Sequence, residues 1–183
     1  MREIMLPLKE EDIRELKIGE SVLLSGIMYT GRDAAHKRIV ESIDKKEELP
    51  FDIKGQTIYY VGPTPNKEGE VIGSAGPTTS YRMDSYTPIL LDLGLKGMIG
   101  KGSRSKDIIE AMVRNKCIYF AAIGGAGALI SKSIISSKII AYEDLGAEAV
   151  RRIEVKKFPV IVAIDSTGED LYKVGREKYL VSK

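Results

Sequence analysis

The sequence is poor in the two side chains that most often bind transition metals. A single cysteine, Cys117, and a single histidine, His36, occur among its 183 residues. One cysteine excludes an internal disulfide and suits a reducing compartment. The pair can build neither a Cys/His zinc site nor a thiolate-held iron–sulfur cluster, so we expect any such metal to come from a partner. Cys117 is flanked by apolar residues and is expected to be a small core residue.

Long apolar runs and an excess of one charge are also missing. No stretch approaches the roughly 20 apolar residues of a membrane span, and the first residues lack the apolar region and cleavage site of a secretory signal. The 28 basic and 26 acidic residues give a net charge of +2, which is too even for a protein that binds nucleic acid or membrane surfaces. With 43% hydrophobic residues the chain is expected to be a globular, cytoplasmic protein.

Strand-like and helical segments alternate along the chain, which predicts an α/β layered domain. We expect one domain, residues 1–173, and a basic C-terminal tail, residues 174–183. A capping box at Thr30 and Asp33 predicts the start of a helix that runs to Ile43. Pro88 is expected to kink or delay the helix that follows Arg82. The other expected elements are strands at Ser21–Tyr29, Thr57–Val61, Gly97–Gly100, Cys117–Ile123 and Pro159–Asp165, and a helix at Lys106–Asn115 capped by Ser105.

The segment Gly73-Ser-Ala-Gly-Pro-Thr-Thr-Ser-Tyr-Arg-Met-Asp84 gathers several groups that bind anions. Its glycines and Pro77 favour a tight, irregular turn, after which Thr78, Thr79 and Arg82 follow. Such a turn can present free backbone N–H groups, a threonine hydroxyl and a guanidinium to one carboxylate or phosphate. The simpler alternative is a structural turn with threonine as a helix cap and arginine in solvent.

A second segment, Thr30-Gly-Arg-Asp-Ala-Ala-His-Lys-Arg38, places Arg32 where a strand gives way to a helix. The unpaired N–H groups of a helix start favour anions, and a guanidinium adds a bidentate clamp for a carboxylate. His36 lies one turn further along the same face and can act as an acid or a base, or be a packed residue. Asp33 is expected to be structural, either capping the helix or orienting Arg32.

Two glycine-rich segments superficially resemble nucleotide loops. In Gly100-Lys-Gly-Ser103, Gly102 separates the lysine from the serine that a phosphate-binding loop requires next to it. The turn Gly124-Gly-Ala-Gly127 lacks the spacing of a dinucleotide-binding fingerprint. We therefore disfavour a nucleotide-binding domain, while Lys101 can still be an anion ligand at a strand end or a solvated lysine. Arg32, Arg82 and Lys101 together suit a small dianion.

Five segments in a fixed order carry a resemblance to a known family. They are Tyr-Thr-Gly-Arg-Asp-Ala-Ala-His-Lys-Arg, Tyr-Val-Gly-Pro-Thr-Pro, Gly-Ser-Ala-Gly-Pro-Thr-Thr-Ser-Tyr-Arg-Met-Asp, Gly-Lys-Gly and Ala-Ile-Gly-Gly-Ala-Gly-Ala-Leu. Between about Leu6 and Asp170 the chain resembles the β subunit, or C-terminal domain, of the class I iron–sulfur fumarate hydratases and the related L-tartrate dehydratases. The resemblance implies a swivelling β/β/α domain that closes over a larger α subunit, whose cysteines hold a [4Fe–4S] cluster.

By that resemblance Arg32, Arg82 and Lys101, together with Thr79, bind the substrate, and Thr78 is the base near the carbon-bound proton, with His36 as a second catalytic candidate. Threonine is a very weak base and needs an adjacent cation or relay. The implied activity is a hydro-lyase that interconverts fumarate and (S)-malate and works only with its cluster-bearing partner, as a hetero-oligomer or a homodimer. Dehydration of tartrate to oxaloacetate is the alternative within the same chemistry, and a non-catalytic module that binds a dicarboxylate is the alternative outside it.

Overall fold

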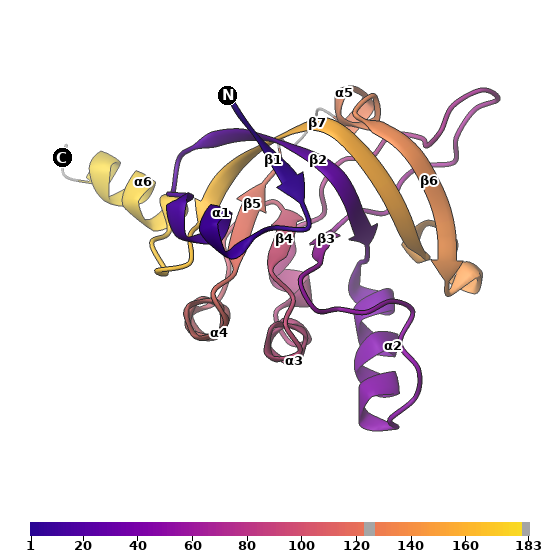
Figure 1. The fold of residues 1–183 in the computed structure, drawn as a ribbon, viewed down its shortest axis with the longest axis horizontal. Helices are drawn as coiled ribbons and strands as arrows, with labels where there is room; N and C mark the ends of the chain where they lie inside the picture. The colour runs from indigo at the N-terminus through magenta and orange to yellow at the C-terminus, as the bar shows by residue number, and fades with distance from the viewer. Residues whose placement is uncertain (123–126, 181–183) are drawn as a thin grey trace.

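The computed structural model describes residues 1–122 and 127–180, with side chains up to residue 176. Within these residues a mixed sheet of seven strands is accompanied by short helices (Figure 1). The strands are β1 (Arg2–Leu6), β2 (Ser21–Thr30), β3 (Thr57–Tyr59), β4 (Gly97–Gly100), β5 (Ile118–Ala121), β6 (Ile134–Ala141) and β7 (Val150–Ile164). The helices are α1 (Glu10–Glu15), α2 (Asp33–Asp44), α3 (Thr87–Asp92), α4 (Lys106–Asn115), α5 (Gly127–Ser131) and α6 (Leu171–Leu180), with 3₁₀ turns η1 (Ser80–Met83) and η2 (Glu143–Glu148).

The strand pairings close into a ring. Strands β2, β3, β4 and β5 pair in parallel, β5 pairs with β7 in the antiparallel sense, and β7 pairs back onto β2. The ring can close because β2 and β7 are long enough to pair with more than one strand in turn. Outside the ring, β1 lies beside β2 and β6 lies beside β7. The four parallel strands therefore end at one common edge.

Side chains of β3 and β5 alternate between two apolar cores. Tyr59 and Phe120 belong to the core that the ring shares with β1 and α1. Ile58 and Tyr119 belong to the core that the sheet shares with helices α2, α3 and α4. Because successive side chains on a strand point to opposite faces, a strand covered on both faces must be apolar throughout. This explains why these strands appear in the sequence as continuous apolar runs.

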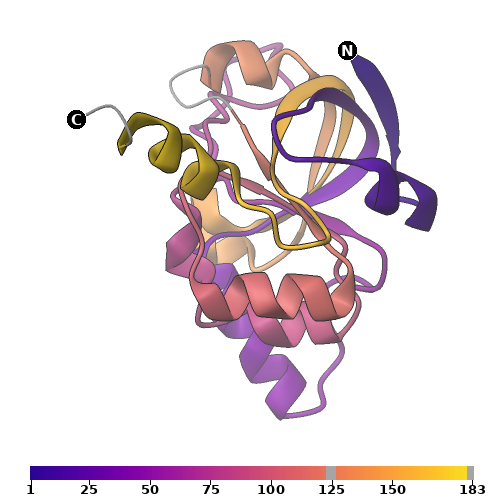
Figure 2. The same cartoon turned by 90° about the vertical axis from the view of Figure 1, so that its left-hand side faces the viewer.

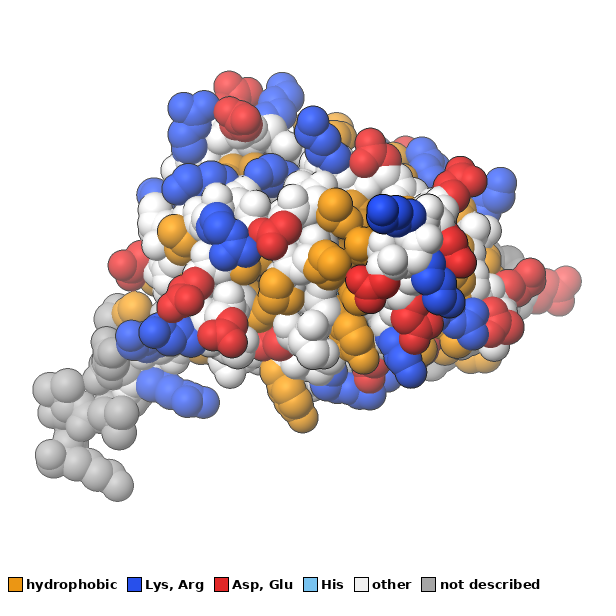
Figure 3. Space-filling view, turned by 90° about the horizontal axis from the view of Figure 1, so that it is seen from below, with side chains coloured by type: hydrophobic (Ala, Val, Ile, Leu, Met, Phe, Trp, Pro, Cys, Tyr) orange, Lys and Arg blue, Asp and Glu red, His pale blue; other side chains and the backbone are white. Residues whose placement is uncertain are grey.

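Helices α2, α3 and α4 lie together on one side of the molecule, and the arched strands β2, β6 and β7 lie on the other side (Figures 1 and 2). Figure 3 looks at the helical side and shows acidic and basic side chains interspersed across it, in keeping with the nearly balanced charge of the sequence. Helix α5 lies at the opposite end of the molecule from α3 and α4 (Figure 2).

Most of the expected elements are present. The bounds of β4 and α4 match the prediction, and β2, β3 and β5 differ from it by one to three residues. Pro88 does delay a helix, because the chain forms η1 first and α3 begins only at Thr87, with Pro88 in its first turn. Ser105 occupies the N-cap position of α4, although its side chain makes no capping hydrogen bond.

Other expectations fail or lie outside the description. The alternation of strands and helices breaks down after α5, where β6 and β7 form a long antiparallel pair that was not expected in full. The strand β1 was also missed. Of the predicted turn Gly124–Gly127, only Gly127 is described, as the first residue of α5. Helix α6 crosses the expected start of a tail at residue 174, and the division into domain and tail stays a prediction.

Candidate functional site

Three predicted cations follow strands that end at the same edge of the sheet. Arg32 comes after β2, Lys101 comes directly after β4, and the segment with Thr78 and Arg82 belongs to the connection between β3 and β4. Because β2, β3 and β4 are parallel, their carboxyl ends lie side by side, which is where α/β sheets bind ligands. The topology thus brings together residues that are up to 69 positions apart in the sequence.

Part of the connection between β3 and β4 pairs with neighbouring backbone at this edge through isolated bridges. The N–H of Thr78 donates to the carbonyl of Tyr60 at 2.7 Å, and the N–H of Ser80 donates to the carbonyl of Lys101 at 2.9 Å. In return the N–H of Lys101 donates to the carbonyl of Thr78 at 3.3 Å. The N–H groups of Thr78 and Ser80 are therefore bonded to backbone carbonyls and are not free for a ligand. The turn also presents the half-buried side chains of Thr78 and Thr79, with Thr79 paired in register with Lys101.

Arg32 is the N-cap residue of α2, and its side chain is only 23% exposed. Its Nη2 lies 3.1 Å from Oε1 of Glu148, a residue of η2. Its Nε is buried and has no hydrogen-bond partner among the described residues. The guanidinium lies against Gly62, where a Cβ atom would come within 2.7 Å of Nη1. Gly62 is thus needed for close approach, and Arg32 is held between two segments remote in sequence.

Arg82 forms an ion pair with Asp33, the first residue of α2. The expectation that Asp33 caps the helix with Thr30 or orients Arg32 is wrong, since its contact is with Arg82. The hydroxyl of Thr30 instead accepts from the N–H of Arg151 at 3.0 Å and donates to the carbonyl of Ala149 at 3.4 Å. Thr30 is the last residue of β2, so its hydroxyl serves the sheet and not the helix. Asp33 links the segment of Arg82 to that of Arg32.

His36 lies beneath this edge and is completely buried. A carbonyl oxygen can only accept, so the 2.8 Å contact with the carbonyl of Arg32 means that Nδ1 carries the proton. The Nε2 atom is then a bare acceptor, and it has no partner among the described groups. Burial, aided by the charge of Arg104, lowers the pKa of His36 to about 4. At neutral pH the ring is uncharged, and its contact is with the backbone of Arg32.

Lys101 is exposed, and no ion pair joins its ammonium to another described residue. Its backbone is supported from below. The hydroxyl of Tyr119 donates to the carbonyl of Gly102 at 2.8 Å and accepts from Ser80 at 2.8 Å. The N–H of Gly102 donates to the hydroxyl of Tyr172 in α6 at 3.1 Å. The backbone beside Lys101 is thus held by hydrogen bonds, and the exposed side chain can meet an anion.

Arg104 is not among the site residues predicted from the sequence, and its buried side chain holds the segment at the end of η1. Its side chain is 0% exposed, and its Nε donates to Asp84 at 2.6 Å. The guanidinium lies over the rings of Tyr60 and Tyr119, at 5.4 and 5.2 Å from their centroids. A buried charge of this kind is tolerated only when it is paired and hydrogen-bonded. It fixes the end of η1 beside β4.

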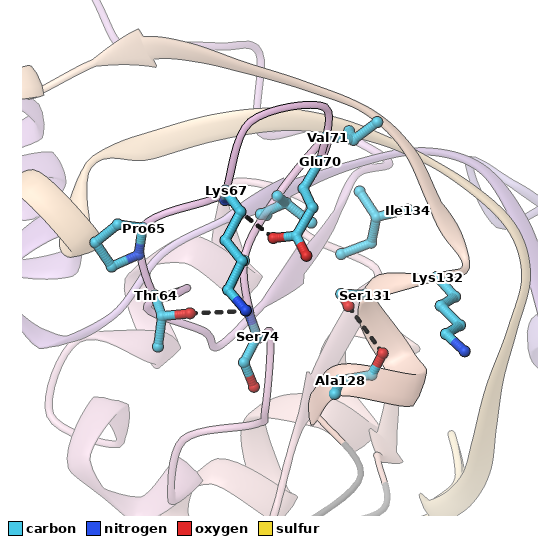
Figure 4. A pocket seen from close by; sticks show the side chains of 12 residues that line it. Thr64, Pro65, Lys67, Glu70, Val71, Ser74, Ala128, Ser131, Lys132 and Ile134 are labelled. Atoms are coloured by element: carbon cyan, nitrogen blue, oxygen red, sulfur yellow. Dashed lines mark hydrogen bonds between the residues drawn. The ribbon is translucent and has the colours of Figure 1, made fainter.

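A large cavity lies away from these cations. It has a volume of about 600 Å³ and lies between the segment of residues 64–74, helix α5 and the start of β6 (Figure 4). Thr64, Lys67, Glu70, Ser74 and Lys132 contribute its polar side chains. Within it the Thr64 hydroxyl is already bonded to the N–H of Ser74, and Glu70 to the N–H of Lys67. We place the candidate site at the cations, since they follow parallel strands that end at the same edge of the sheet.

The described residues contain no group of three or more His, Cys, Asp or Glu side chains that could hold a metal ion. Cys117 is buried, and burial raises the pKa of its thiol to about 12, which disfavours a thiolate ligand. None of the described helices is both long and apolar enough to span a bilayer.

The geometry so far defines a class, namely an α/β domain with arginine and lysine side chains gathered at the carboxyl edge of parallel strands. Such an arrangement suits small carboxylate or phosphate ligands. Comparison with known families is more specific, because residues 1–175 match the model described as Fumarase C-terminus. The chain belongs to this family.

The chain is similar to part of some longer proteins and to nearly the whole of a protein of its own size. It is 38% identical to fumarate hydratase 2 of Leishmania major, over 88% of this chain and 29% of that protein. It is 37% identical to the aerobic class I fumarate hydratase of Escherichia coli strain K12, over 91% of this chain and 31% of that protein. It thus spans about three-tenths of these relatives. The protein named "Putative L(+)-tartrate dehydratase subunit beta" of Methanocaldococcus jannaschii is 37% identical, over 93% of this chain and 91% of its own length.

Proposed function

We propose that this chain is the non-cluster subunit of a class I fumarate hydratase, which interconverts fumarate and (S)-malate. Two observations support the proposal: membership of the Fumarase C-terminus family, and the gathering of Arg32, Arg82 and Lys101 at one strand edge. The ring of strands with a helical layer on one side is compatible with a swivelling β/β/α domain, which would close over a larger partner.

In this proposal the cations bind the two substrate carboxylates. Arg32 and Arg82 are planar donors that suit bidentate contacts, whereas Lys101 is a point charge on a flexible stem. The half-buried Thr79 contributes a hydroxyl beside them. Each contact made equally with fumarate and malate lowers the KM without changing the chemical step.

Thr78 is the proposed proton-transfer residue. In the dehydration direction it takes the proton from the carbon next to the one that loses the hydroxyl, and it returns a proton on hydration. No hydrogen bond joins its hydroxyl to another described residue, so a cation or relay in the assembled site must favour the loss of its proton. His36 is fully buried, which favours a role in holding the Arg32 backbone over direct contact with substrate.

The metal would come from a partner that carries a [4Fe–4S] cluster, since the described residues offer no metal-binding group. Such a cluster supplies a Lewis-acidic iron for the substrate hydroxyl. The assembled protein is then cytoplasmic and hetero-oligomeric, and the isolated chain is catalytically silent.

A tartrate dehydratase is the second candidate, and one observation favours it. The relative whose own length is matched almost completely is the one named as a tartrate dehydratase β subunit. The two reactions differ by one substrate hydroxyl, which one or two side chains suffice to read.

The test is to produce the chain with the product of the neighbouring gene, reconstitute the cluster without oxygen, and assay malate and tartrate in parallel. Turnover of malate with at most weak turnover of tartrate supports the first proposal, and the reverse result supports the second. In the active complex, Thr78→Ala should lower kcat by about 10²-fold or more with a small change in KM, whereas Thr79→Ala should act mainly on KM. If neither substrate is turned over and the lone chain binds dicarboxylates, the protein is a binding module.

A further inference from the structure

Glu148 connects two structures that meet only after folding. It is the last residue of η2, the turn that joins β6 to β7, and its carboxylate contacts the first turn of α2. Its Oε1 lies 3.1 Å from Nη2 of Arg32, and its Oε2 accepts from the N–H of Ala34 at 3.2 Å. One carboxylate therefore holds both the guanidinium of Arg32 and the first turn of the helix that Arg32 precedes.

The position of Glu148 is fixed by its neighbours. The next residue, Ala149, accepts a hydrogen bond from the Thr30 hydroxyl, and the N–H of Arg151 donates to the same hydroxyl. These bonds attach the start of β7 to the last residue of β2, two positions before Arg32. The Glu148 side chain is only 22% exposed, so its charge acts in a poorly hydrated environment where it is weakly screened.

Arg32 is in turn held at both ends. Its carbonyl accepts from the N–H and the Nδ1–H of His36, each at 2.8 Å. Its guanidinium contacts Glu148 at Nη2, while the buried Nε has no partner among the described groups. Fixing a long side chain before a ligand arrives reduces the conformational entropy lost on binding. The remaining N–H donors are thereby left in a defined direction.

We propose that Glu148 is a positioning residue, which holds the Arg32 guanidinium in the orientation that binds a substrate carboxylate. The inference rests on the proposed function, in which Arg32 is a carboxylate ligand. It adds to the site a residue from the β6–β7 connection, 116 positions away in the sequence.

The chain offers a matched control in the same turn. Asp144 of η2 pairs with Arg38 of α2 at 2.5 to 2.7 Å, so it also links the turn to the helix. This second pair faces solvent and makes no contact with Arg32. Comparing Glu148→Gln with Asp144→Asn therefore separates the loss of a link between the two elements from the loss of the contact to Arg32. The glutamine keeps an acceptor for the N–H of Ala34, and Glu148→Ala removes both contacts.

Two measurements test the proposal. The first is ¹⁵N relaxation of the Arg32 Nε–H group in the full chain, assigned with Arg32→Lys. We expect Glu148→Gln to make this group more mobile and Asp144→Asn to leave it as in the wild type. The second is steady-state kinetics of the reconstituted complex. There Glu148→Gln should raise KM about ten- to hundredfold, as expected when a binding group is misplaced by about 1 Å. Its kcat should stay within about twofold of the wild-type value, because the lost contact is made in the ground state and the transition state alike.

The outcomes are distinguishable. An Arg32 Nε–H group that stays equally rigid in Glu148→Gln and Glu148→Ala overturns the inference, whatever the activity. So does a Glu148→Gln complex with unchanged KM whose melting temperature falls as much as that of Asp144→Asn, since the role is then structural only. If Arg32 becomes mobile as expected but the wild-type complex acts on neither malate nor tartrate, the hold of Glu148 on Arg32 stands and the proposed function fails.

Discussion

The only histidine in the sequence should make the stability of this protein fall in mild acid. His36 is completely buried, and burial lowers its pKa from 6.5 to about 4. Between these two values the unfolded chain binds a proton that the folded protein excludes. The free energy of unfolding is therefore at its full value above pH 6.5 and decreases as the pH falls towards 4.

The size of the effect follows from the two pKa values. At pH 5 the unfolded histidine is almost wholly protonated, whereas the folded one is about nine-tenths neutral. The proton then favours the unfolded state by a factor of about 30, which is about 2 kcal/mol relative to neutral pH. Most aspartates and glutamates are still ionised at pH 5. A loss of this size is a substantial part of the 5–15 kcal/mol that stabilises a typical domain.

The assay is urea unfolding of the wild type and of His36→Asn at pH 7 and pH 5. Asparagine can donate to the Arg32 carbonyl as Nδ1 does, but it does not titrate. The variant should be less stable at both pH values because it leaves part of the buried space empty. Its loss between pH 7 and pH 5, however, should be smaller than that of the wild type by about 2 kcal/mol. Equal losses in the two proteins would refute the reasoning, as would an NMR titration that gives the folded ring a pKa near 6.5.

Two further predictions concern the support of the site. Asp84→Ala leaves the fully buried guanidinium of Arg104 without its carboxylate, and it should cost about 3–5 kcal/mol of unfolding free energy, whereas Asp92→Asn in a half-exposed ion pair should cost at most about 1 kcal/mol. Urea unfolding measures both, and similar losses would contradict the difference in burial. Gly62→Ala places a Cβ atom 2.7 Å from Nη1 of Arg32, so it should displace the guanidinium and raise KM in the complex up to about 10²-fold. An unchanged KM in Gly62→Ala would contradict this expectation.

The parts of the fold that local chemistry determines were predictable. Strand β4 is a short apolar run between turn residues, and α4 follows a serine in a helix-starting position. Pro88 marks a helix start because it lacks an N–H group and is tolerated only in the first turn. In each case the signal lies within a few residues of the element it determines.

The parts that depend on distant partners were not predictable in the same way. In residues 150–158 the buried Val150, Ile153, Val155 and Phe158 are interrupted by charged residues, and a bulge in the pairing with β2 shifts the alternation. Residues 150–158 still form a strand because their backbone pairs with β2 on one side and with β6 on the other. No local pattern in the sequence predicts that β7 pairs with β2 and so closes the ring.

The residues of the candidate site likewise fall into two groups, those that local sequence signals identify and those that only distant contacts reveal. Arg32, Arg82 and Lys101 could be recognised because each stands at a turn after a strand or beside glycines. Residues that bind ligands are often placed on such loops. Glu148 stands in a segment with no such signal, and Arg104, in the turn after β4, is buried instead of facing a ligand. Their roles arise from contacts with Arg32 and Asp84, which are 116 and 20 positions away. Only the folded geometry shows that a glutamate at the end of a 3₁₀ turn meets an arginine at the start of α2.

The pairing of both arginines with carboxylates does not remove them from anion binding. A guanidinium carries five N–H donors, and a carboxylate occupies at most about two of them. Arg32 and Arg82 each contact their acidic partner through Nη2, and the buried Nε of Arg32 remains without a partner among the described groups. The acidic partners reduce the repulsion between neighbouring cations before a ligand binds, and they fix where the remaining donors point. With Asp33 and Glu148 in place, the three cations leave one positive charge, that of Lys101, without an ion-pair partner in the described part of the chain. In the proposed function one substrate carboxylate compensates this charge, and both carboxylates meet donors that are already ordered.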